Sequence, residues 1–109
     1  MKSVIAVRPG HLEILDTPVP RPGPYQALVR TECACLCNRT DSELLHGTFP
    51  GMEDKFPFAL GHESVGTVVE VGEKVRNFAV GDRAVGGLNF DLQMDGMNSG
   101  WGGFGEFTM

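Results

Sequence analysis

Glycine places the strongest limit on how this chain can fold. Fifteen of its 109 residues are glycine and seven are proline. The glycines concentrate after Gly81 and include the run Gly100-Trp101-Gly102-Gly103-Phe104-Gly105. Glycine adopts backbone conformations that other residues avoid, and proline lacks an amide donor. The pattern therefore predicts tight turns and short strands rather than long helices.

The overall composition narrows the class of protein. Hydrophobic residues make up 41% and charged residues 21%, which is ordinary for a soluble globular domain. The net charge is −5 without a basic cluster, so we expect neither nucleic acid nor a membrane as a partner. No apolar run reaches the ~18 residues that span a bilayer. Arg8 interrupts the first apolar run too early for a signal peptide, so we expect a cytoplasmic protein.

The first third of the chain reads as strands. Residues 3–7 and 12–17 alternate around the Pro9-Gly10 turn, which predicts a hairpin. Four alternating prolines between Pro18 and Pro24 predict an extended connector without ladder hydrogen bonds. Residues 27–36 alternate again and predict a strand with one buried face that delivers Cys37 at its end.

One short helix is predicted after this strand. Thr40 and Glu43 have the spacing of a capping box, and we expect Gly47 to end the helix. His46 fits the end of that helix, where a cationic ring is favourable. Residues 48–60 read as a loop.

The second half of the chain again predicts strands. We expect them at residues 65–71, 83–85 and 103–109, with turns at residues 72–74 and at Gly81-Asp82. Residues 88–101 show no clear period. Trp101 and Phe104 are expected to be packing residues. Together these patterns predict a mainly β fold closed as a barrel or sandwich, with one or two short helices.

Three cysteines two residues apart are the only cysteines of the chain: Cys33, Cys35 and Cys37. An odd count at this spacing does not indicate a secreted disulfide framework. Free thiols, or one metal-bound thiolate, fit better. We expect Cys33 and Cys35 to pack as small buried hydrophobic residues.

Cys37, His62 and Glu63 form a candidate metal site. Each lies at the predicted end of a strand, and Gly66 in the following strand allows a close backbone approach. A thiolate, an imidazole and a carboxylate make a partial tetrahedral zinc site that leaves one position for substrate or water. The soft thiolate favours zinc over magnesium or calcium.

These residues lie in a longer pattern that resembles a known family. Gly61-His62-Glu63, followed by Gly66, Gly72 and Val75, is similar to the zinc signature of the medium-chain dehydrogenase/reductase superfamily at every fixed position. The similarity covers nearly the whole chain, including the segments at residues 34–41, 80–83 and 102–107. It implies a GroES-like, partly open β-barrel over residues 1–109, an incomplete N-terminal catalytic domain without the Rossmann domain.

The resemblance also implies roles for individual residues. Cys37 and His62 would be catalytic zinc ligands, and Glu63 a ligand or an outer-sphere carboxylate. Thr40 would relay the proton of the substrate hydroxyl, and Asp41 would orient His62. The parent enzyme would be an NAD(P)-dependent dehydrogenase of a small alcohol or polyol, in which a zinc-bound alkoxide gives hydride to the nicotinamide. We expect the chain alone to be inactive.

Three departures from the family pattern affect these expectations. Two residues, Asn38 and Arg39, separate Cys37 from Thr40 where the family usually has one. Cys35 stands where glycine is common, so a second thiol lies close to the expected ligand Cys37. No cysteine follows Cys37, so we expect no structural zinc.

Two other functions remain open from the sequence. One is a non-catalytic GroES-like interaction or scaffold module, which could self-associate through surfaces exposed by truncation. The other is a zinc-free reductase relative. The dinucleotide-binding glycine pattern also occurs, at Gly100, Gly102 and Gly105, but no βαβ unit is predicted around it, so it is a weak match.

Overall fold

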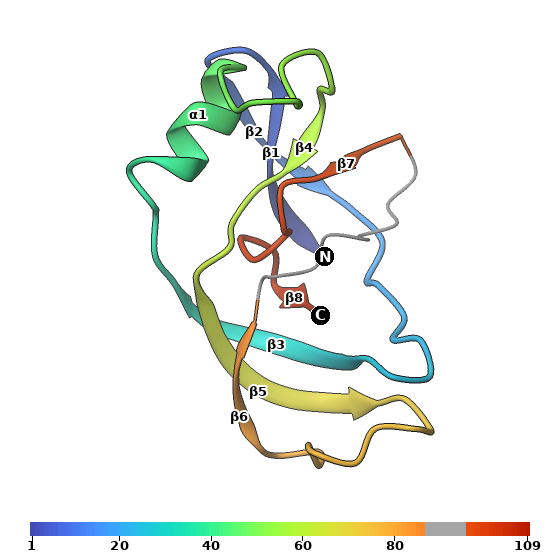
Figure 1. The fold of residues 1–109 in the computed structure, drawn as a ribbon. Helices are drawn as coiled ribbons and strands as arrows, with labels where there is room; N and C mark the ends of the chain where they lie inside the picture. Colours follow the sequence, from blue (N-terminus) through green and yellow to red (C-terminus); the bar gives the residue numbers. More distant parts are fainter. Residues whose placement is uncertain (87–95) are drawn as a thin grey trace.

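Strands dominate the structure, a computed structural model that describes residues 1–86 and 96–109. Eight strands and one helix follow in the order β1 (Lys2–Arg8), β2 (His11–Asp16), β3 (Ala27–Ala34), α1 (Thr40–His46), β4 (Phe58–Ala59), β5 (Ser64–Val71), β6 (Arg83–Gly86), β7 (Asn98–Ser99) and β8 (Phe107–Thr108). They form two four-stranded sheets, in the orders β2-β1-β4-β7 and β6-β5-β3-β8 (Figure 1). The predicted mainly β, GroES-like fold is confirmed.

The predicted N-terminal hairpin is present as β1 and β2. Gly10 lies in the tight turn with φ +71°, and Arg8 is paired with His11 across it. β1 places Ile5 and Ala6 in the core, both fully buried, and pairs on its other edge with β4. The hairpin is therefore an integral part of the first sheet.

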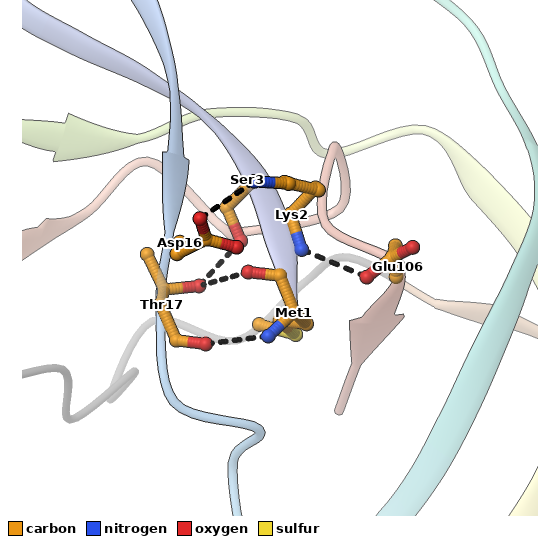
Figure 2. A network of polar contacts seen from close by, with 6 residues as sticks. All are labelled: Met1, Lys2, Ser3, Asp16, Thr17 and Glu106. Atoms are coloured by element: carbon orange, nitrogen blue, oxygen red, sulfur yellow. Dashed lines mark hydrogen bonds and ion pairs between the residues drawn. The ribbon is translucent and has the colours of Figure 1, made fainter.

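Polar contacts close the open end of this hairpin (Figure 2). The N-terminal ammonium donates to the carbonyl of Thr17 at 2.7 Å, and the hydroxyls of Ser3 and Thr17 lie 2.8 Å apart. The amide of Lys2 donates to the carboxylate of Glu106 at 2.8 Å. This last bond joins the hairpin to the segment just before β8.

The second sheet is built on the antiparallel pair of β3 and β5. Its core contains Val29, Val68 and Ala84. The strict alternation predicted for residues 27–36 is wrong, because bulges interrupt the register after Leu28 and after Thr31, and Leu28 and Val29 are both buried. Gly66 is needed here, since an added Cβ would lie 2.0 Å from the carbonyl oxygen of Arg30.

The helix lies where it is predicted, but it begins differently. Arg39 is the N-cap residue without a side-chain cap, so the capping box expected from Thr40 and Glu43 is wrong. The physical reason is that Thr40 already lies in the helix: the amide of Glu43, which the cap would have bonded, donates to the backbone carbonyl of Arg39 at 2.8 Å. Gly47 ends the helix as predicted, with φ +70° and its amide bonded to the carbonyls of Glu43 and Leu44.

The structure differs from the predictions for residues 48–60 and for the last strand. The region read as a loop, residues 48–60, contains the short strand β4, which pairs with β1 and, in parallel, with β7. The last predicted strand is reduced to β8, which pairs with β3. The predicted turns at residues 72–74 and at Gly81-Asp82 are both present. Residues 87–95 of the segment without a clear period lie outside the described residues.

The core continues from the sheets to the helix. Leu44 of α1 packs with Ala6, Phe58 and Leu60, and Trp101 and Phe104 pack against this cluster as predicted. Within the described ranges, no helix has the length and apolarity to cross a membrane.

Candidate metal centre

Cys37, His62 and Glu63 lie together in the structure. Each residue offers one ligand atom: the cysteine a sulfur, the histidine a ring nitrogen and the glutamate a carboxylate oxygen. These three atoms all lie within 4.8 Å of one another. Cys37 comes from the connection between β3 and α1, and the other two come from the connection between β4 and β5. Both connections run along the same side of the molecule (Figure 1).

Asp41 holds two of these residues in place. Its carboxylate accepts the backbone amide of Cys37 at 2.8 Å and lies 3.1 Å from Nδ1 of His62. Its side chain is 1% exposed. Because a carboxylate only accepts, the proton of the neutral imidazole lies on Nδ1, which leaves the lone pair of Nε2 for a metal.

The environment of Cys37 favours its thiolate. The pKa of Cys37 is lowered, first by the backbone amide of Thr40 and next by that of Arg39. The Thr40 hydroxyl and, to a smaller degree, His62 lower this pKa further, and partial burial opposes them. Since the thiolate is the metal-binding form, this arrangement prepares the sulfur as a ligand.

Glu63 faces the other nitrogen of His62. Its carboxylate lies 3.8 Å from Nε2, and its side chain is about half exposed. The carbonyl of Glu63 accepts the backbone amide of Cys35 at 2.8 Å, which joins the strand carrying the cysteines to the loop carrying the two other donors.

Glycines let the chain pass close to the segment before His62. Gly61 has φ +104°, and an added Cβ would lie 2.5 Å from the amide nitrogen of Phe104. The amides of Gly103 and Phe104 donate to the carbonyls of Gly61 and Leu60, at 2.7 and 3.0 Å. The C-terminal glycine-rich run therefore supports the loop that carries the imidazole and the carboxylate.

Trp101 contacts the site in a way that no sequence pattern indicates. Its ring centroid lies 5.3 Å from that of His62. The Phe49 centroid lies 5.9 Å from it, and the plane of the Phe49 ring is nearly perpendicular to the indole plane. A packing role alone is expected from the sequence, because the residues are 39 positions apart and nothing local links them.

The remaining cysteines differ from their predicted environment. Cys33 and Cys35 are exposed and all three thiols are free, so the prediction of buried packing is wrong. The bulge after Thr31 displaces the end of β3 from strict register, and both thiols line a hollow of about 290 Å³ beside His62 and Glu63. Neither joins the metal cluster found among the described residues.

The other candidate residues lie apart from the cluster. His46 is at the end of α1, as predicted, with Nδ1 2.8 Å from the carbonyl of Ser42. His11 lies 3.3 Å from the carboxylate of Glu13 in the hairpin. The segment with Gly100, Gly102 and Gly105 leads into β8 and not into a helix. This context does not match a dinucleotide-binding turn.

The donor set fits zinc. A thiolate, an imidazole and a carboxylate are among the ligands that zinc takes in proteins, and three such ligands leave a fourth position open. The Asp41–His62 contact is the kind of outer hydrogen bond that orients metal-binding imidazoles.

Comparison with known proteins gives consistent results. Residues 23–109 match the family model of the alcohol dehydrogenase GroES-like domain. The acryloyl-coenzyme A reductase of Sulfurisphaera tokodaii is 40% identical over 86 residues, 78% of this chain and 25% of that protein. The sorbitol dehydrogenase of Bos taurus is 37% identical over 81 residues, 74% of this chain and 23% of that protein.

A solved structure supports the same assignment. A zinc-binding dehydrogenase from Sinorhizobium meliloti, bound to NADP, shares 41% identity and a TM-score of 0.66, covering 75% of this chain and 23% of that one. The chain spans about a quarter of the length of the curated relatives compared here. The chain belongs to the alcohol dehydrogenase GroES-like domain family, the N-terminal domain of the medium-chain dehydrogenase/reductase superfamily.

Proposed function

We propose that residues 1–109 form the metal-bearing part of the catalytic domain of a zinc-dependent alcohol or polyol dehydrogenase, and that this part supplies Cys37, His62 and Glu63 as ligands. One observation supports this proposal most strongly: the three donor atoms lie within 4.8 Å of one another, although the residues come from two separate connections of the fold. The family model starts at residue 23, but β1 pairs with β4 and Lys2 bonds to Glu106, so the domain includes the hairpin.

The residues around the ligands have separate tasks in this proposal. When bound, zinc would act as a Lewis acid toward the oxygen of an alcohol or carbonyl. Asp41 keeps the proton on Nδ1 of His62 and fixes the backbone at Cys37. The Thr40 hydroxyl helps to lower the pKa of the Cys37 thiol, and the family resemblance assigns it the relay of the proton of the substrate hydroxyl.

The rest of the proposal concerns the whole protein. The relative that acts on sorbitol and the structure bound to NADP support a polyol or alcohol as substrate and a nicotinamide as hydride acceptor. The family resemblance assigns cofactor binding to a Rossmann domain. We therefore propose that these 109 residues supply metal and substrate contacts, are inactive alone and work in the cytoplasm.

Metal binding tests the proposal directly. We expect the purified chain to bind one zinc, and its cobalt form to show a thiolate-to-cobalt charge-transfer band. Cys37→Ser should abolish the band, whereas the matched control Cys33→Ser, which removes an exposed thiol of β3, should keep it. A band of equal strength in both variants, or no bound metal in the unchanged chain, would show that the assignment is wrong.

A zinc-free reductase is the second candidate function. Its reductase activity is favoured by the 40% identity to an acryloyl-coenzyme A reductase. In this case the full-length protein would reduce an activated carbon–carbon double bond, and both Cys37→Ser and chelator treatment would leave its activity unchanged. Loss of activity in either experiment would instead favour the zinc-dependent dehydrogenase.

A further inference from the structure

The backbone of Trp101 is in a conformation that disfavours its side chain. It has φ +71° and is the single non-glycine residue with positive φ in the described ranges. A side chain there crowds the backbone, so glycine is the residue that such a position favours. Glycine stands on both sides of it, at Gly100 and Gly102. A strained residue of this kind persists where its surroundings fix it, and such positions cluster at functional sites.

The backbone around Trp101 is fixed by the segment that leads to His62. The amides of Gly100 and Gly102 both donate to the carbonyl of Ala59, at 2.8 and 3.0 Å, and that of Gly103 donates to Gly61 at 2.7 Å. An added Cβ at Gly100 would lie 2.8 Å from the oxygen of Ala59. The indole therefore extends from a loop that is bonded to the same segment as the imidazole.

The indole then lies beside that imidazole. The two ring centroids are 5.3 Å apart with the planes tilted by 60°, and Phe49 contacts Trp101 edge-on from another direction. Asp41 fixes His62 at one point, its Nδ1 atom. A hydrogen bond at one ring nitrogen still allows the ring to tilt around that bond, whereas an aromatic contact limits the tilt.

We infer that Trp101 is a positioning residue for His62: its indole holds the imidazole at the tilt that directs Nε2 toward the Cys37 sulfur and the Glu63 carboxylate. This inference rests on the proposed role of His62 as a metal ligand. The inference also explains why the strained backbone carries a tryptophan. A glycine at position 101 would relieve the strain but would leave the imidazole of His62 without its aromatic contact.

Three substitutions separate this role from simple packing. Trp101→Phe keeps an aromatic ring, Trp101→Ala removes the ring but keeps the unfavourable φ, and Trp101→Gly removes both. We expect the metal affinity of Trp101→Phe to stay close to that of the unchanged chain. In Trp101→Ala and Trp101→Gly it should fall by about ten-fold, the size seen for lost outer contacts of metal ligands. Val68→Ala, in the buried core of the other sheet, is the control for a loss of stability alone.

The readouts are cobalt affinity from the charge-transfer band and stability from denaturant unfolding. We expect the Ala and Gly variants to lose affinity equally although the Gly variant is the more stable of the two. If affinity instead follows stability, with Val68→Ala weakened as well, the positioning role is wrong. An unchanged affinity in Trp101→Ala also overturns it, while the absence of a cobalt band in the unchanged chain overturns the metal site itself.

Optical spectroscopy gives an independent check. Trp101 is the only tryptophan of the chain, so its emission reports on this position alone. Cobalt bound at Nε2 of a ring 5.3 Å away should quench the emission at one equivalent, and Cys37→Ser should prevent this at the same cobalt concentration. Equal quenching in both proteins would show that the quenching does not depend on the Cys37 site, and the absence of quenching in the unchanged chain would show that cobalt does not bind beside Trp101.

Discussion

Asp41 connects the two ends of the proposed metal site. The family resemblance implies its contact with His62, but no sequence pattern indicates its second bond, to the amide of Cys37. The carboxylate can serve both donors because it lies in the first turn of α1, between the two connections that carry the ligands. One buried side chain thus sets the position of a sulfur and the tautomer of an imidazole.

Replacing Asp41 with asparagine tests this double role. The asparagine amide has one acceptor oxygen, and its NH₂ group faces whichever donor the oxygen does not reach. We expect zinc affinity, measured by competition with a chromophoric chelator, to fall by about ten- to hundred-fold. Glu43→Gln on the same helix is the control and should bind as before. Equal affinity in the two variants would contradict the role of Asp41.

The lowered pKa of Cys37 predicts a specific pH dependence. Its causes, the amides of Thr40 and Arg39 and then the Thr40 hydroxyl, exist only in the folded chain. The thiolate should therefore persist to lower pH when folded than when unfolded, and the stability that it contributes is lost as pH falls through the folded pKa.

Alkylation of a chain with Cys37 as its sole cysteine, Cys33→Ser/Cys35→Ser, measures this difference. In metal-free protein the rate should reach half its maximum at a lower pH in buffer than in denaturant. Thr40→Val should shift the folded midpoint part of the way back, because the two amides remain. A folded midpoint at or above the unfolded one would contradict the proposed stabilisation of the thiolate.

At the scale of elements, the β3–β5 pair carries the site. β3 leads to Cys37, and β5 begins directly after His62 and Glu63. At Gly66 the two strands leave no room for a side chain, because an added Cβ would lie 2.0 Å from the backbone oxygen of Arg30.

Gly66→Ala should therefore destabilise the whole fold. Neither backbone can move without breaking the ladder between the strands, so we expect a loss of about 3 kcal/mol or more in denaturant unfolding. Gly23→Ala is the matched control, because its added methyl would meet only the flexible end of Gln26, and its effect should stay within about 0.5 kcal/mol. A Gly66→Ala protein as stable as the control would show that the strands can separate freely.

Patterns of period two and turn residues predicted most of these elements. The hairpin, β3, β5, β6 and the end of α1 at Gly47 follow from local sequence. β4 does not, because a two-residue strand is defined by its partners β1 and β7, which are distant in the sequence. The side-chain cap expected at Thr40 is absent for a different reason: the amide of Glu43 donates to the backbone carbonyl of Arg39 instead.

At the scale of the whole molecule, the site depends on long-range contacts. The sequence predicts Cys37, His62 and Glu63 as a candidate metal site, and the fold brings their donor atoms within 4.8 Å of one another. The exposure of the Cys33 and Cys35 thiols depends on a bulge in β3, and the position of the indole depends on a contact with His62, which is distant in the sequence. Local sequence patterns encode neither feature. The hairpin of β1 and β2 precedes the part matched by the family model, yet Figure 2 shows it bonded to Glu106 near the other end of the chain.

X-ray absorption at the zinc edge tests the central claim, that Cys37, His62 and Glu63 share one metal ion. For the zinc-loaded chain we predict a single sulfur at about 2.3 Å together with nitrogen and oxygen ligands at about 2.0–2.2 Å. The sulfur should disappear in Cys37→Ser and remain in Cys35→Ser. A first shell without sulfur, or with two or three sulfurs, would contradict the account.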